Sequence, residues 1–156
     1  MTLADLKQNV VLPDILRRTH AQARAELTRA TMSHGPVAQA ARRAIRIYFP
    51  HFEREESTIF PALALVPDLA QGVVRPEMRD TLALISAFKA RRDSLADEHR
   101  WILCAIDDMV QTASREGNKE FLDFACELRN HERMEEEILF PTVMLIGNYL
   151  SEKLPR

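Results

Sequence analysis

Two stretches of the sequence decide its fold: HFEREESTIFP at residues 51–61 and HERMEEEILFP at residues 131–141. Each begins with a histidine, has two consecutive glutamates four and five positions later, and ends in Phe-Pro. Upstream, a second pattern is also repeated, with Asp14-x-Leu16-x-x-x-His20 returning as Asp93-x-Leu95-x-x-x-His99. The offset is 79 residues for the single histidines and 80 for the His-x-x-x-Glu pairs. The chain is therefore an internal duplication.

Apolar residues recur at steps of three and four along four segments, which is typical of amphipathic helices and not of strands. The segments cover about residues 16–30, 44–58, 95–109 and 121–138. Breaks between them fall at Ser33-His34-Gly35-Pro36, between Val66 and Pro76, and at Gly117-Asn118. We therefore expect an all-α, up-down-up-down four-helix bundle with a short N-terminal arm. The sequence leaves open whether the third helix is long or is preceded by a separate helix before Asp93.

Length and composition favour one domain over residues 1–156, built from two repeats at about 12–65 and 90–145. The net charge of −2 provides no broad basic surface, so we expect neither nucleic acid nor a membrane as partner. The two cysteines, Cys104 and Cys126, form no framework, and the N-terminus has no long apolar core. These features predict a cytoplasmic protein. They leave its oligomeric state undetermined.

Six polar residues fall on the apolar faces of the predicted helices: His20, His51, Glu55, His99, His131 and Glu135. A His and a Glu four positions apart project from the same side of a helix, so both can reach one site. An unpaired glutamate in a core costs several kcal/mol, so it must be neutralised, paired or bound to a metal. A single histidine on such a face is usually a hydrogen-bonded core residue. Six matched positions favour a cation site.

Imidazole and carboxylate ligands together suit iron, manganese or zinc. A Glu and a His at short helical spacing, repeated on two helices of a bundle, follow the pattern of di-iron carboxylate sites. Two glutamates that each bridge two ions would support a pair of metals.

The repeated pattern H…HxxxEE…FP resembles the hemerythrin-like (HHE cation-binding) family over residues 12 to about 145. The resemblance implies a non-haem di-iron centre with an oxo or hydroxo bridge and the six residues above as ligands. It implies one iron held by His20 and His51, another by His99 and His131, and bridging by Glu55 and Glu135.

Two departures from the family bear on function. Oxygen-carrying hemerythrins have a fifth histidine ligand one turn from the third-helix histidine, whereas Leu95 and Leu103 occupy those positions here. Similar di-iron proteins that repair iron–sulfur clusters usually carry an additional N-terminal cysteine-bearing domain, which this sequence does not contain.

We therefore expect a protein that binds or senses a small ligand such as O2, NO or a related reactive species, and not a metabolic enzyme. The alternative is a redox or repair protein that acts on peroxide, NO or damaged iron–sulfur clusters. A third reading is a bundle with purely structural histidines. Glu56 and Glu136 are interpreted as surface residues or neighbours of the ligands, the two cysteines as buried thiols, and Trp101 as a packing residue.

Overall fold

A computed structural model gives the structure of the chain and describes residues 12–154, apart from the side chains of residues 92, 93 and 96. Within this range every regular element is helical. The elements are α1 (Leu12–Thr31), α2 (Gly35–Thr58), α3 (Phe60–Leu63), α4 (Val66–Ala70), α5 (Met78–Ala90), α6 (Arg92–Glu116), α7 (Lys119–Met134), the π-helix η2 (Glu135–Leu139) and α8 (Phe140–Lys153). The predicted N-terminal arm lies outside the described residues.

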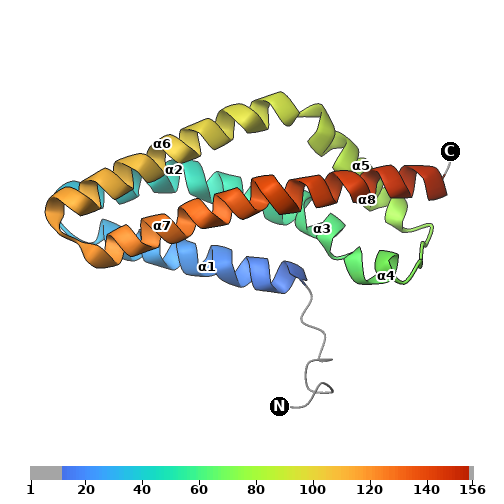
Figure 1. Cartoon of the computed structure of the whole chain (residues 1–156), viewed down its shortest axis with the longest axis horizontal. Helices are drawn as coiled ribbons and strands as arrows, with labels where there is room; N and C mark the ends of the chain where they lie inside the picture. The colour runs from blue at the N-terminus through green and yellow to red at the C-terminus, as the bar shows by residue number, and fades with distance from the viewer. Residues whose placement is uncertain (1–11, 155–156) are drawn as a thin grey trace, which may run out of the picture.

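The helices form the expected up-down-up-down bundle (Figure 1). Helices α1 and α2 make one hairpin, and α6 and α7 make the other, with both turns at the same end of the molecule. The third arm is divided: α5 ends at Ala90 and α6 begins at Arg92. The fourth arm runs from α7 through η2 into α8 without a break and packs along α5 at its far end.

Both hairpin turns use the residues that the sequence marks as helix breakers. His34 is in the N-cap position of α2 without a side-chain cap hydrogen bond, and Pro36 occupies the first turn, where the missing N–H costs no hydrogen bond. Helix α6 ends at Glu116 and is followed by Gly117, whose φ of 62° is left-handed and favours glycine. The amide of Asn118 then donates to the Ala113 carbonyl, and its side chain accepts from the amide of Phe121.

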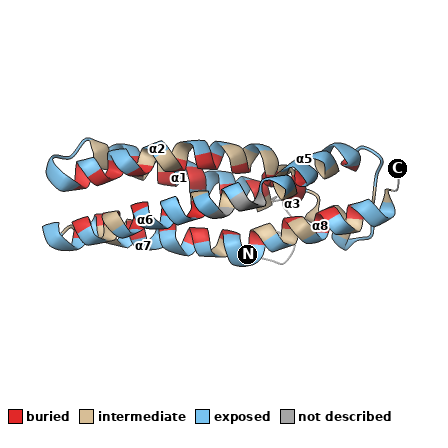
Figure 2. Cartoon of the chain, turned by 90° about the horizontal axis from the view of Figure 1, so that it is seen from above, coloured by how far each residue is buried: buried red, intermediate tan, exposed pale blue. Residues whose placement is uncertain are grey.

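Buried residues line the inner faces of the helices (Figure 2) and form two apolar clusters. The first cluster lies toward the hairpin turns and includes Leu27, Tyr48, Phe52, Ile106 and Leu128. The second lies toward α5 and α8 and includes Leu16, Ile59, Phe60, Ile85 and Val143. In each long arm, buried histidines and glutamates lie between the residues of the first cluster and those of the second.

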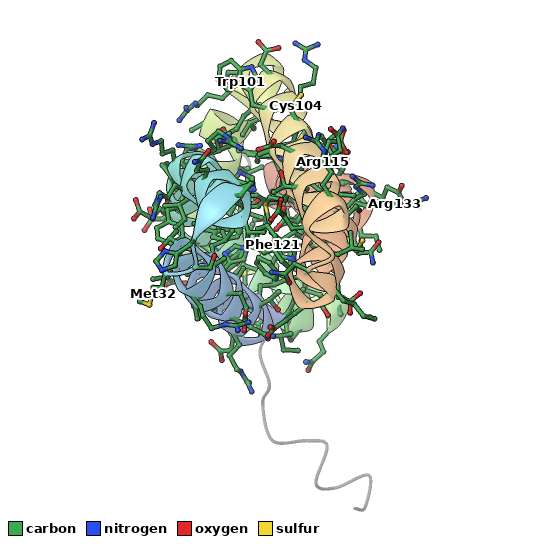
Figure 3. All side chains as sticks on the ribbon, turned by 90° about the vertical axis from the view of Figure 1, so that its left-hand side faces the viewer. Met32, Trp101, Cys104, Arg115, Phe121 and Arg133 are labelled. Carbon is green, nitrogen blue, oxygen red and sulfur yellow. The ribbon has the colours of Figure 1, made fainter. Side chains whose placement is uncertain are left out.

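Three residues expected inside the bundle lie on its surface. Trp101 is 65% exposed, and both Cys104 and Cys126 are exposed. Figure 3 shows Trp101 and Cys104 on the outer side of α6, whereas Phe121 points between the helices. The interpretation of the cysteines as buried thiols and of Trp101 as a packing residue is therefore wrong. Among the described helices, none is long and apolar enough to cross a membrane.

Helices α5 and α8 approach closely at Gly147, which is buried. A Cβ atom added at Gly147 would lie 2.6 Å from Cγ2 of Ile85, well inside van der Waals contact. Because Ile85 is β-branched and fully buried, its γ2 methyl has little freedom to move away. The small size of Gly147 therefore sets the distance between these two helices.

We predict that Gly147→Ala destabilises the protein by about 1–3 kcal/mol, because it overpacks the α5–α8 contact. The melting temperature measures this effect. Ile85→Leu removes the γ2 methyl, so the double variant Gly147→Ala/Ile85→Leu should lose less stability than the two single changes added together. Strict additivity in this cycle would contradict the close approach.

Candidate metal centre

The buried polar layer brings together all six sequence-predicted residues and one more. Their side chains come from α1, α2, α6, α7 and η2, so every long arm contributes to it. Each of them is less than 9% exposed. The set consists of His20, His51, Glu55, His99, His131, Glu132 and Glu135.

The histidines fall into two pairs, each joining neighbouring arms of different hairpins. The Nε2 atoms of His20 and His131 lie 3.2 Å apart, and we call these two residues the first donor group. His51 and His99 form the second donor group, with ring centroids 5.4 Å apart. The family resemblance implies other pairs, His20 with His51 and His99 with His131, and Oε2 of Glu55 lies near Nε2 of both His20 and His51.

Glu55 and Glu135 lie between the two donor groups. Oε1 of Glu135 is 2.7 Å from Nε2 of His131, and its Oε2 is 3.6 Å from Nε2 of His51. Oε2 of Glu55 is 3.6 Å from Nε2 of His20 and 3.3 Å from Nε2 of His51. The two oxygens of Glu135 thus face different groups, as those of a carboxylate that bridges two metal ions would, and one oxygen of Glu55 lies near a histidine of each group.

Three of the four histidines turn their Nδ1 atoms toward an outer carboxylate. The Nδ1–H of His20 donates to Glu56 at 3.0 Å, and that of His99 donates to Glu136 at 2.8 Å. Nδ1 of His51 lies 3.3 Å from Glu98. Such outer carboxylates fix the tautomer and orientation of a metal-binding histidine and leave Nε2 free for the ion. The interpretation of Glu56 and Glu136 as neighbours of the ligands agrees with these contacts.

Arginines hold two of these outer carboxylates in place. Arg24 donates to Glu56 at 2.7 Å, and Arg54 pairs with Glu98. Burial raises the pKa of Glu56, but the hydrogen bonds from Arg24 and His20 outweigh it and hold that pKa below its usual value. The carboxylate is therefore ionised and able to accept the proton of a neutral imidazole.

Burial and close contacts shift the pKa values of several groups in the buried polar layer. Burial raises the pKa of Glu132 to about 8, with help from the charge of Glu135. Burial and Glu135 also raise the pKa of Glu55 well above its usual value. Burial opposes ionisation of Glu135 too, but hydrogen bonds from His131, His20 and His51 hold its pKa well below the usual value. For His51, burial lowers the pKa, yet Glu135, Glu55 and Glu132 raise it to about 9.

Several atoms of this layer are left without protein partners. Both oxygens of Glu55 and of Glu132, and the Nε2 atoms of His51 and His99, have no hydrogen-bond partner among the described residues. Buried polar atoms in native proteins are almost always hydrogen-bonded, so a cluster of exceptions needs an explanation. Their donor atoms lie within 4.8 Å of one another in sets of three, close enough to hold a cation. Imidazole nitrogen with carboxylate oxygen is a donor set that fits iron, manganese or zinc.

A surface pocket of about 560 Å³ reaches the centre at His99. It lies beside the division between α5 and α6, and α8 forms its other wall. Its lining is largely apolar, with one acidic and one basic side chain: Phe88, Lys89, Leu95, His99, Glu136, Phe140, Pro141 and Met144. The pocket offers a small molecule a path to the second donor group.

Two functional candidates were missed by sequence reasoning. Glu132 directly follows a predicted ligand and lies one turn before Glu135, and this spacing of three positions was the signal available for it. Glu98 directly precedes His99, yet it lies beside His51 of another helix, which spacing along one helix cannot reveal.

Comparison with known protein families matches residues 11–143 to the Hemerythrin HHE cation binding domain. Comparisons with curated proteins and with solved structures give no match. The family match spans most of the chain and contains every residue of the buried polar layer. The chain therefore belongs to the hemerythrin HHE cation-binding family.

Proposed function

We propose that this cation-binding protein holds two iron ions in a non-haem di-iron centre and uses them to bind or sense a small ligand such as O2 or NO. The ligands would be His20, His51, Glu55, His99, His131 and Glu135. The observation that carries the proposal is the position of Glu55 and Glu135, each of which faces both donor groups. A single ion would need only one of the groups.

The number of donors favours reaction with an added ligand over a purely structural ion. Each ion would receive two imidazole nitrogens and one oxygen from each shared carboxylate, which makes four protein donors. Structural metal sites close their coordination with protein donors, whereas iron that retains open positions can accept a ligand. Bound iron would supply Lewis acidity and one-electron chemistry at this layer. The protein residues orient the donors, exclude bulk water and hold the protons on Nδ1.

A redox or repair role is the second candidate, and the pocket at His99 favours it. Its volume of about 560 Å³ is far larger than a diatomic molecule needs. Measured turnover of peroxide or NO by the iron-loaded protein would support this candidate, and binding without turnover would support the first. We also propose a cytoplasmic location, in keeping with two free, exposed cysteines.

We predict that protein purified from iron-supplied cells contains about two irons per chain. The reduced protein should bind NO, and the oxidised protein should bind azide, each followed by its absorption spectrum. Exposure of the reduced protein to O2 should oxidise it, and purging with argon should not restore the reduced spectrum. Full recovery on purging would indicate a reversible oxygen carrier, and fewer than two irons would contradict the di-iron proposal.

We predict that Glu55→Ala and Glu135→Ala lose more iron than Glu56→Ala and Glu136→Ala. The first two carboxylates face both donor groups, whereas the second two contact only the outer nitrogen of one histidine each. Loss of an outer carboxylate typically reduces metal affinity by about 10- to 100-fold, so its effect should appear only under chelator competition. Equal iron content in all four variants would refute this assignment.

We predict that metal removal lowers the melting temperature and reverses its dependence on pH. The pKa of His51 is raised from 6.5 to about 9, and that of Glu132 from 4.5 to about 8. Both groups therefore keep protons in the folded state at pH values where the unfolded chain releases them. The metal-free protein loses the contribution of Glu132 as pH rises from 4.5 to about 8, and that of His51 as pH rises from 6.5 to about 9. Bound metal needs neutral imidazoles and ionised carboxylates, so its stabilisation grows over the same range. Parallel pH profiles for the two forms, measured by thermal unfolding, would contradict this prediction.

A further inference from the structure

The duplication relates the two donor groups to each other. Adding 79 positions to His20 gives His99, and adding 80 to His51 gives His131. The repeat therefore exchanges the first donor group with the second. The same operation exchanges Glu55 with Glu135, the two carboxylates that face both groups. Chemically equivalent positions for the two metals are the starting expectation for such a centre.

One buried position breaks this equivalence. Phe52 follows the histidine of the first repeat, and Glu132 follows that of the second. Phe52 is fully buried and stacks on His20, with ring centroids 4.2 Å apart and planes inclined by 24°. Glu132 occupies the matching place beside His99, where its Oε2 lies 3.9 Å from Nδ1. An apolar ring on one side of the centre is thus replaced by a carboxylate on the other.

We propose that Glu132 is a further ligand of the metal at the second donor group and has no counterpart at the first. This inference rests on the proposed function, because it needs two metal ions. Oε2 of Glu132 lies 3.8 Å from Nε2 of His51. One donor atom from each of His51, Glu132 and Glu135 lies within 4.8 Å of the other two. The carboxylate is therefore within reach of the ion that His51 would hold.

The alternative, a carboxylate that only packs, leaves Glu132 with only Tyr48 and the imidazoles of His51 and His99 as polar neighbours. Its side chain is 1% exposed, and neither oxygen has a hydrogen-bond partner among the described residues. The outer carboxylates differ, because Glu56 is paired with Arg24 and Glu98 with Arg54. An isolated buried carboxylate is costly, whereas coordination to a cation removes that cost.

Charge balance supports the same assignment. Two divalent ions bring four positive charges into a layer enclosed by two apolar clusters. Glu55 and Glu135 offset two of them, and an ionised Glu132 offsets a third. A buried site favours the smaller net charge because the surrounding dielectric is low.

The consequence is a centre whose two metal ions have different coordination. The ion at the second donor group has five protein donors, from His51, His99, Glu55, Glu135 and Glu132. The ion at the first donor group has four, from His20, His131, Glu55 and Glu135. With the oxo or hydroxo bridge that the family resemblance implies as one more donor to each ion, six-coordinate iron keeps one open position at the first group and none at the second. An added ligand should bind at the first donor group, beside Phe52.

The test uses the full chain loaded with ⁵⁷Fe. Mössbauer spectra of the oxidised wild-type protein should show two iron environments of equal area, and titration should give one azide per two irons. Glu132→Gln keeps the size of the side chain, and Glu132→Phe copies the residue of the first repeat. In both variants the Mössbauer parameters of one iron should shift toward those of the other. The number of azides bound per two irons should rise to two. One iron should also pass to a chelator about tenfold faster.

The control is Glu137→Gln, which alters an exposed carboxylate that contacts Arg133 on the same arm. It should leave the spectra and the stoichiometry unchanged. Unchanged Mössbauer parameters in iron-loaded Glu132→Gln would overturn the inference while leaving the di-iron proposal intact. If the Glu132 variants fail to fold, the wild type still decides: two equivalent irons that take two azides would overturn it. Fewer than two irons in the wild type would instead overturn the proposed function.

Discussion

The rest of this structure depends on one constraint, the burial of three carboxylates between two apolar clusters. None of the three is paired with an arginine or a lysine among the described residues. Glu55, Glu132 and Glu135 are each less than 5% exposed. Their neighbours are four imidazoles, of which His51, despite its burial, has a pKa raised to about 9 by these carboxylates. Burying such a layer is unfavourable in a metal-free chain. Metal binding therefore contributes to folding, and the bundle and its site cannot be treated as separate features.

The sequence alone predicts the bundle and places six polar residues at one depth, because both depend on local periodicity and on the duplication. Hairpin turns at Gly35 and Gly117 place His20 level with His51, and His99 level with His131. The repeat then supplies the evidence that a single motif lacks. A histidine four positions before a glutamate is common in helices, but the same pair at matching depth in two halves is not expected by chance.

What the sequence leaves undecided depends on which helices become neighbours across the bundle. Pairing of His20 with His131 follows from contact between α1 and α7, two arms far apart in the chain. Trp101 and Cys104 are exposed because they lie on the face of α6 that points outward. The apolar nature of a side chain does not show which face of its helix it occupies. Glu132 was missed for another reason. Its equivalent in the first repeat is a phenylalanine, so a search for what the halves share overlooks it.

The differences between the halves are where a duplicated site can specialise. In the first half, Arg24 holds Glu56 against His20, and that carboxylate is 27% exposed. The equivalent of Arg24 in the second half is Leu103, and Glu136 beside His99 is 49% exposed and lines the pocket. The second half therefore places its outer carboxylate where solvent and small molecules reach it, whereas in the first half Arg24 pairs with a less exposed carboxylate. Because Glu136 accepts the Nδ1 proton of His99, a molecule that binds Glu136 from the pocket would alter the basicity of that imidazole. A molecule in the pocket would therefore meet Glu136 on one side of the centre, whereas a ligand added to a metal ion would bind at the first donor group on the other side.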